Sequence, residues 1–318
     1  MEQVQLEGPK LRVTAVGFGC AGLMQSPSRK ERMAVLGSAV DSGITHFDTA
    51  RMYGLGMAEE ELGAFLRTVD RDAVTVATKF GIDAVGAARR LGRFQAPARA
   101  LLQKAPALRR VVKRRQAAFN TARSYDAAVA ARSLDESLTA LGVDYVDILF
   151  VHAPRPGDTL ESDELHHFFE RARQQGKIRA WGVSQDEGFE EDFARAFAPE
   201  GVSQLRSDLL NPAPRPADLA FGVLTKSYAA LSGALEADVR LAGRWREVLQ
   251  IDPLAPGALP RLILGSSAMA TGCRAILYST TNPQRVIEAA SAVSSPLDVE
   301  VLTRFRALVE EFRESAVA

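Results

Sequence analysis

The hydrophobic positions of this chain fall into short apolar runs, each followed by a stretch in which apolar residues recur at helical spacing. Several runs are rich in β-branched residues and apolar at nearly every position, which is typical of parallel strands buried on both faces. We expect strands at residues 12–19, 44–48, 73–81, 143–154, 177–185, 202–206, 221–229 and 273–279. We expect helices at residues 28–43, 58–69, 124–142, 164–176, 188–197 and 281–293.

The alternation of strands and helices indicates one α/β domain. Ser28 and Gly43 flank the first helical stretch as a cap and a stop signal would. Eight such strands without an evident linker favour a single (β/α)8 TIM barrel over residues 1–318. A doubly wound sheet is the alternative, because "GFGCAG" fits the Gly-x-Gly-x-x-Gly pattern. We disfavour it, since no acidic residue ends a second strand in the context that this fold requires.

Two long segments interrupt the rhythm, at about 82–123 after the third strand and at about 232–258 after the seventh. In a barrel both would emerge at the carboxyl ends of the strands, where active sites form. Loops of this length are commonly functional or disordered.

Composition limits the classes of function. Hydrophobic residues make up 47 % and charged residues 25 % of the 318 residues, and 39 basic residues balance 39 acidic ones. This balance gives no reason to expect a nucleic-acid partner. Cys20 and Cys273 have no ligand-like neighbours, so we expect two buried thiols, with no disulfide framework and no metal. Without a signal peptide or an apolar run of about 20 residues, a cytoplasmic location is expected.

Polar residues end several of the predicted strands. A single one is typical of a satisfied polar group at a strand edge, but several on one rim of a barrel indicate a site. They are Asp48, Lys79, His152 and the pair Ser184 and Gln185, with Tyr53 just beyond the second strand.

These residue types suit proton transfer to an oxygen. A phenol with a pKa near ~10 is a poor acid at neutral pH. A nearby ammonium group stabilises the phenolate and lowers that pKa, and a carboxylate holds the ammonium in place. A histidine can hydrogen-bond the substrate oxygen as negative charge develops on it. Reduction of a carbonyl by hydride requires this chemistry.

Several motifs together resemble the aldo-keto reductase superfamily. "GITHFDTARMYGLGMAEEELGAFL", from Gly43 to Leu66, is similar to the long signature of that family. "TKFG", "VDYVDILFVHAP" and "GKIRAWGVSQ" resemble the segments around its lysine, its histidine and its Gly-Val-Ser motif. The resemblance implies a catalytic tetrad of Asp48, Tyr53, Lys79 and His152, with Tyr53 as the general acid and His152 orienting the carbonyl.

The resemblance also implies a nicotinamide nucleotide bound across the barrel mouth. Ser184, Gln185 and Gln204 match the positions that hold the carboxamide, and "YSTTNPQRVIEAA" resembles the segment that binds the adenosine phosphate. Hydroxyls and backbone N–H groups near a helix start suit a phosphate, and Arg285 would pair with a ribose 2′-phosphate. NADP is therefore expected over NAD. The residues expected at this end of the cofactor are Ser279, Thr280, Thr281 and Arg285, and Ser227 of the seventh strand is a further expected cofactor-binding residue.

Two departures from the family pattern concern the nicotinamide. Ser207 stands where we expect the tyrosine that stacks on its ring, and "TKSYAAL" replaces the usual Tyr-Ser-Pro-Leu of the seventh strand. Tyr228 would then be a substitute ring. Lys226 would either meet a pyrophosphate oxygen or point to solvent.

The segment at 86–115 is basic, with Arg and Lys interleaved with apolar residues. Three interpretations are open: a solvated covering helix, a cationic lid that attracts an acidic or phosphorylated substrate, and a helix on an anionic membrane surface. Pro97 and Pro106 break the segment, which disfavours a membrane-lying helix. We favour the lid.

The leading hypothesis for function is an NAD(P)H-dependent oxidoreductase that reduces an aldehyde or ketone. A dehydrogenase acting on a sugar or a secondary alcohol is the first alternative, because the tetrad does not fix the direction of the reaction. The second is a non-catalytic nucleotide-binding regulator, which an intact tetrad disfavours. We expect a small-molecule substrate and a monomer or weak oligomer.

Overall fold

A computed structural model describes residues 1–83, 122–160, 163–186, 192–270 and 272–317. Eight strands close into a barrel in the order β10-β11-β12-β3-β4-β5-β8-β9, and every neighbouring pair is parallel. This arrangement confirms the predicted (β/α)8 fold class. The strands are β3 (Val16–Gly19), β4 (His46–Asp48), β5 (Thr75–Phe80), β8 (Val146–His152), β9 (Ile178–Gln185), β10 (Val202–Arg206), β11 (Leu219–Phe221) and β12 (Ala275–Tyr278).

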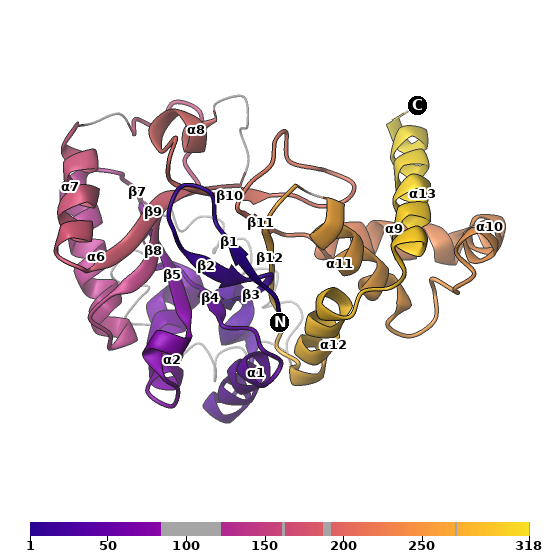
Figure 1. The fold of residues 1–318 in the computed structure, drawn as a ribbon, viewed down its shortest axis with the longest axis horizontal. Coiled ribbons are helices and arrows are strands. Elements are labelled where there is room, and N and C mark those ends of the chain that lie inside the picture. Colours follow the sequence, from indigo (N-terminus) through magenta and orange to yellow (C-terminus); the bar gives the residue numbers. More distant parts are fainter. Residues whose placement is uncertain (84–121, 161–162, 187–191, 271, 318) are drawn as a thin grey trace, which may run out of the picture.

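The helices surround this barrel and extend from one side of it (Figure 1). They are α1 (Arg29–Asp41), α2 (Met57–Leu66), α6 (Ala127–Leu141), α7 (Asp163–Gln174), α8 (Phe193–Phe197), α9 (Thr225–Ala237), α10 (Val239–Leu249), α11 (Ala258–Ala270), α12 (Pro283–Ser294) and α13 (Val299–Val317). The predicted cap of α1 is confirmed: Ser28 and Glu31 form a reciprocal capping box. In the described part of the chain, no helix is long and apolar enough to cross a membrane.

A hairpin of β1 (Gln3–Gln5) and β2 (Arg12–Thr14) lies at the amino-terminal end of the barrel. Its apolar residues Leu6, Leu11 and Val13 share a buried cluster with Ile148 and Leu219 of the barrel strands. Burial of this surface stabilises the closed end of the barrel. The open end is therefore the opposite one, where the strands finish.

The predicted seventh strand is wrong in its placement. The structure ends β11 at Phe221, and the expected strand residues from Thr225 onward form the first turns of α9. Gly222, with φ of +77°, ends the strand, and Leu224, Leu231 and Leu235 recur at helical spacing. A short apolar run does not distinguish a strand from a helix by its pattern alone, and here the helix formed.

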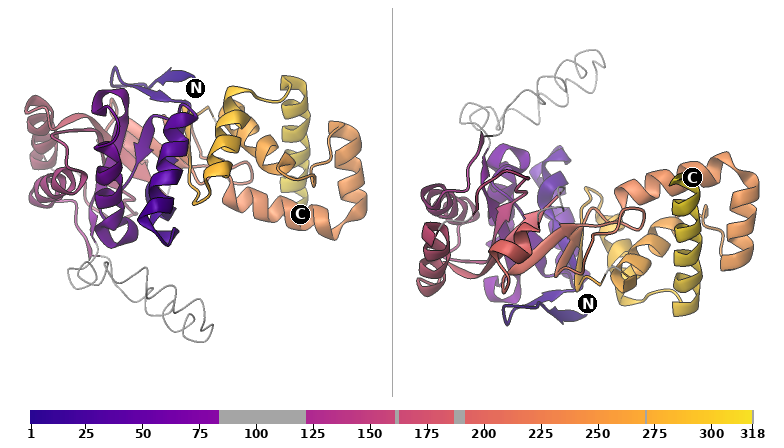
Figure 2. Two further views of the ribbon diagram at one scale, coloured as in Figure 1. Left: turned by 90° about the horizontal axis from the view of Figure 1, so that it is seen from below. Right: turned by 90° about the horizontal axis from the view of Figure 1, so that it is seen from above.

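Helical structure fills much of the second expected insertion, 232–258. Helices α9, α10, α11 and α13 pack around a hydrophobic cluster separate from the barrel core, in which Trp245 meets Phe305 edge to face at 5.8 Å between ring centroids. Figure 2 shows these orange and yellow helices beside the indigo and magenta barrel. The connection between β10 and β11, residues 207–218, is fully described and contains no helix. That the whole chain is one domain stays a prediction.

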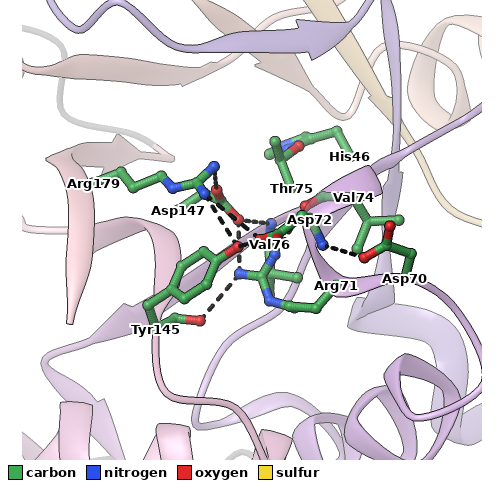
Figure 3. Close-up of polar contacts among 10 residues, drawn as sticks. All are labelled: His46, Asp70, Arg71, Asp72, Val74, Thr75, Val76, Tyr145, Asp147 and Arg179. Atoms are coloured by element: carbon green, nitrogen blue, oxygen red, sulfur yellow. Dashed lines mark hydrogen bonds and ion pairs between the residues drawn. The ribbon is translucent and has the colours of Figure 1, made fainter. Parts of the chain in front are cut away.

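Figure 3 shows a polar cluster at the amino-terminal ends of β5, β8 and β9. We call it the floor cluster, and it consists of Asp147, Arg71, Arg179, Tyr145 and Asp72. The fully buried Asp147 accepts hydrogen bonds from Arg71 (2.8 Å), Arg179 (2.9 Å) and the backbone N–H of Val76 (2.8 Å). Both guanidinium groups lie over the Tyr145 ring, and the Tyr145 hydroxyl donates to Asp72 at 2.6 Å. Both carboxylates of the floor cluster lie within ion-pair distance of an arginine, Asp147 of Arg71 and Arg179 and Asp72 of Arg179.

Candidate active site

The open end of the barrel holds a buried ion pair. Asp48 is the last residue of β4, and Lys79 lies one residue before the end of the neighbouring β5. Lys79 Nζ donates to both carboxylate oxygens of Asp48, at 2.5 and 2.6 Å, and to the carbonyl of Thr49 at 3.1 Å. Only 2–3 % of either residue is exposed. Because an unpaired buried charge is costly, each of the two fixes the position of the other.

Tyr53 reaches this pair from a tight loop between β4 and α2. Its backbone N–H donates to Ala50 at 3.0 Å, and a short 3-10 helix, Tyr53–Gly56, follows. The phenol ring lies 5.4 Å from Lys79 Nζ and packs edge to face against His152, with 5.8 Å between ring centroids. The structure therefore brings all four residues of the predicted tetrad together.

The surroundings set the protonation of these groups. Burial, followed by the charge of Asp48, raises the pKa of Tyr53 well above its ordinary value of 10.0. Burial and the charges of Lys79 and Arg123 hold the pKa of His152 well below 6.5. The phenol thus keeps its proton and the imidazole is neutral at pH 7. The expected lowering of the Tyr53 pKa by Lys79 does not hold for this structure, because burial dominates and the nearby Asp48 charge acts in the same raising direction.

Two of the three predicted carboxamide residues join the same network. Ser184 donates to the side-chain oxygen of Gln204 at 2.5 Å, and Gln204 Nε2 donates to Asp48 Oδ2 at 2.8 Å. The adjacent strands β9 and β10 pair these residues in register. Gln185 is fully buried at the end of β9. The amide and hydroxyl groups of these residues suit a polar planar ligand at the mouth.

The predicted phosphate segment follows β12. Ser279 lies against Gly19 and Gly22 of the first βα loop, where a Cβ added at Gly22 would be 3.2 Å from Ser279 Oγ. Thr280 Oγ1 accepts from the backbone of Asn282, which in turn caps α12. Thr281 stands between them, immediately before that helix.

A cavity of about 590 Å³ opens between α9, α11 and α12. Arg285 and Gln284 line it from the first turn of α12, Arg261 from α11 and Tyr228 from α9. Arg261 could not be predicted from the sequence, because only the packing of α11 beside α12 brings it to the predicted phosphate segment. Glu288 lies in the same wall.

Ser227 is placed apart from the strand ends. It is buried in the first turn of α9 and donates to Asp208 at 2.9 Å. Ser207 is also buried and accepts from the backbone of Ala213 at 3.1 Å. The aromatic residue that ends β11 is Phe221, whereas the predicted strand 221–229 had it at the start, away from the mouth. The Arg206 guanidinium lies 5.2 Å from the Phe221 ring centroid.

The basic segment 86–115 lies outside the described residues. Within the described ranges, no group of three or more His, Cys, Asp or Glu side chains is arranged to hold a metal ion. Cys20 and Cys273 are both buried, as expected.

Comparison with known proteins identifies the family. The model of the Aldo/keto reductase family matches residues 15–192, which is more than half of the chain. The chain therefore belongs to the aldo/keto reductase family, and the tetrad residues lie within the matched part.

Curated relatives match over shorter stretches of their own length. D-threo-aldose 1-dehydrogenase of a Pseudomonas species is 29 % identical over 70 % of this chain and 59 % of its own. Aldo-keto reductase yakc [NADP(+)] of Schizosaccharomyces pombe is 32 % identical over 54 % of this chain and 43 % of its own length. Pyridoxal 4-dehydrogenase of Microbacterium luteolum is 37 % identical over 45 % of this chain and 40 % of its own length. The chain spans about half the length of the curated relatives it matches.

Solved structures share the fold. An aldo-keto reductase of Bacillus halodurans superposes with a TM-score of 0.70 and 19 % identity, covering 97 % of this chain and 96 % of that one. A second aldo/keto reductase, from Brucella melitensis, superposes with a TM-score of 0.61 and 16 % identity, covering 96 % of this chain and 97 % of that one. At these identities the likeness concerns the fold alone.

Proposed function

We propose that this protein is an NAD(P)-dependent oxidoreductase that interconverts a carbonyl compound and an alcohol, with Tyr53 as the proton donor in reduction. The observation that carries the proposal is the buried Asp48–Lys79 pair beneath a protonated Tyr53 and a neutral His152. Membership of a family whose named relatives are reductases and dehydrogenases supports the same reaction class.

Each residue of the tetrad would have one task. Tyr53 gives its proton to the carbonyl oxygen as negative charge develops there. Lys79 stabilises the phenolate that remains, and Asp48 keeps the ammonium group charged and in place. His152 donates a hydrogen bond to the same oxygen and so orients the carbonyl. In the reverse direction the phenolate removes the alcohol proton.

The residues present fit a nicotinamide nucleotide. The Ser184–Gln204 pair would hold the carboxamide, Phe221 offers the stacking ring that Ser207 does not, and Ser279, Thr280 and Thr281 would approach phosphate. When bound, the nucleotide supplies or accepts the hydride. We propose NADP over NAD because Arg285 and Arg261 both line the 590 Å³ cavity, where they would pair with a 2′-phosphate. Ser227, which donates to Asp208, would contribute by holding the 207–211 loop.

A second candidate is oxidation of a sugar or another secondary alcohol as the main task. The names of two relatives, an aldose 1-dehydrogenase and a pyridoxal 4-dehydrogenase, favour it. The regulatory alternative is disfavoured because the four groups of the tetrad are assembled. A cytoplasmic location and a monomeric or weakly oligomeric state stay predictions.

The test uses the purified chain with a panel of aldehydes and ketones, and separately of aldoses and secondary alcohols. Consumption of NADPH, or formation of it from NADP⁺, is followed by absorbance in wild type and Tyr53→Phe. Turnover that is lost in the variant, while quenching of tryptophan fluorescence by NADPH is kept, is the expected result. Nucleotide binding without turnover on any substrate would favour the regulator, and absence of both would contradict the proposal.

A further inference from the structure

We propose that Arg51 is a positioning residue for Tyr53, holding the loop that carries the phenol against the strand that carries Lys79. This inference rests on the proposed function, because it assigns Tyr53 the role of proton donor. Arg51 lies two residues before Tyr53 and is 5 % exposed. Its side chain binds Glu59 and Glu136, so its effect on Tyr53 would be indirect.

The Arg51 guanidinium joins two helices to the loop. Nη1 donates to Glu59 Oε2 of α2 at 2.8 Å, and Nη2 donates to Glu136 of α6. Glu59 is fully buried, whereas the side chain of Glu136 is 39 % exposed. Both bonds join charged groups, which makes them stronger than hydrogen bonds between neutral groups. Arg51 thereby fastens the loop to both α2 and α6.

The second carboxylate oxygen of Glu59 extends the connection to β5. Glu59 Oε1 accepts from the hydroxyl of Thr78 at 2.7 Å, and Thr78 is the residue next to Lys79. The backbone N–H of Arg51 also approaches the carbonyl of Lys79, at 3.4 Å. The loop with the proton donor and the strand with the ammonium group are thus joined by side chains from outside the site.

The loop needs such an anchor because its backbone is strained beyond Tyr53. Gly54, Leu55 and Gly56 have φ of +58°, +60° and +89° in succession, and Leu55 adopts this left-handed conformation despite its side chain. A non-glycine residue in that region persists only when its surroundings hold it there. Without Arg51, we expect the segment from Thr49 to Gly56 to sample other conformations and the phenol to leave its position over Lys79.

A purely structural role is the competing explanation, since Glu59 needs a cation when buried. The floor cluster provides the matched control. Arg71 likewise donates to a fully buried carboxylate, Asp147, but at the other end of the barrel. Loss of either arginine lowers stability. Only loss of Arg51 should change the chemistry.

The experiment compares Arg51→Met, Arg51→Lys and Arg71→Met with wild type in kcat, KM, the dissociation constant of NADPH and amide hydrogen exchange. Because misplacement of a reacting group by about 1 Å can cost about 100-fold in rate, we expect Arg51→Met to lower kcat by about 10- to 100-fold. NADPH binding should stay within about twofold of wild type, and exchange should quicken over 49–56. Arg51→Lys should recover part of kcat, and Arg71→Met should keep kcat within about twofold despite a lower melting temperature.

Glu136→Gln keeps the test decisive if Arg51→Met does not fold, because Glu136 is partly exposed. A fall in kcat of about threefold with faster exchange over 49–56 is expected, equivalent to about 0.65 kcal/mol in activation free energy. Unchanged kcat and exchange in Glu136→Gln, or wild-type kcat in a folded Arg51→Met, would overturn the positioning role. If Tyr53→Phe abolishes turnover in either case, the proposed function stands. Turnover that survives in Tyr53→Phe overturns both.

Discussion

The two ends of the barrel use the same kinds of side chain for different purposes. At the floor, Asp147 has three donors and the Tyr145 hydroxyl donates to Asp72. At the mouth, Asp48 is paired with Lys79, and His152 Nδ1 has no partner among the described residues. Unpartnered buried atoms occur at the floor as well, at Arg71 Nε and His46 Nε2, so the contrast lies in the partners of the two tyrosines. Tyr145 is bonded to Asp72, whereas the Tyr53 ring lies against Lys79 and His152.

The largest expected effect separates the two tyrosines. Tyr53→Phe should lower kcat by about 1,000-fold, the middle of the range for general acid catalysis, with the fold intact. Tyr145→Phe should leave kcat unchanged and cost about 1 kcal/mol of stability, because it removes the exposed bonds of the hydroxyl to Asp72 and from Arg179. Steady-state kinetics and urea unfolding of both variants measure the contrast. Equal losses of kcat in the two would abolish the distinction between the ends.

The next effect concerns the buried carboxylate of the floor. Asp147→Asn should destabilise the protein by about 3 kcal/mol, because Arg71 and Arg179 lose their shared anion. The kcat of the folded fraction should not change. Asp48→Asn provides the counterpart, with losses of both stability and kcat, since the charge of Lys79 would be left unpaired. Urea unfolding with activity assays below the transition distinguishes the two, and an unaltered kcat in Asp48→Asn would contradict the assigned role.

Acid should lower the free energy of unfolding through the buried histidines. Burial lowers the pKa of His46, beside Thr75 near the floor, from 6.5 to about 4. Between these values the unfolded chain binds a proton that the folded chain does not, so stability is complete above pH 6.5 and falls as the pH drops toward 4. For His46 alone the loss at pH 5.5 is about 1.4 kcal/mol. His152 adds a loss of the same sign.

Urea unfolding at pH 8 and pH 5.5 measures this slope. His46→Gln should flatten part of the slope and keep kcat, and His152→Gln should flatten part of it and lose kcat. An unchanged slope in both variants would mean that other groups cause the acid sensitivity.

The smallest effect lies outside both clusters, at the cavity beside α12. Arg285→Ala should weaken NADPH binding by about tenfold, equivalent to about 1.4 kcal/mol, and leave NADH binding unchanged. Arg261→Ala, on the opposite wall, should act in the same direction. Fluorescence titration with both nucleotides provides the test. Equal weakening of NADPH and NADH would show that Arg285 does not recognise a 2′-phosphate.

The sequence allowed most of the barrel to be predicted, because its strands are either long apolar runs or end in family motifs. The run 143–154 contains β8, and 73–81 contains β5 with Lys79 one residue before its end. The seventh strand was misplaced because β11 has only three residues, Leu219–Phe221, and the stronger apolar pattern after it belongs to a helix. This misplacement of the seventh strand explains why Phe221 was not expected at the barrel mouth.

Part of the site depends on tertiary packing that no local pattern reveals. Arg51 lies inside the family signature, but its partner Glu136 is 85 residues away on another helix. The raised pKa of Tyr53 depends on burial, which the sequence does not quantify. Arg261 becomes a cavity residue only through the packing of α11 beside α12.

The separate hydrophobic cluster of α9, α10, α11 and α13 bears on how the molecule melts. A chain with two cores need not unfold in one cooperative transition. The cavity with Arg285 and Arg261 has walls from this helical group and from α12, whose Val286, Ala289 and Ala290 belong to the barrel core. A ligand bound there would be lost when either core opens, and its binding free energy would therefore couple the two and draw their melting into a single calorimetric transition.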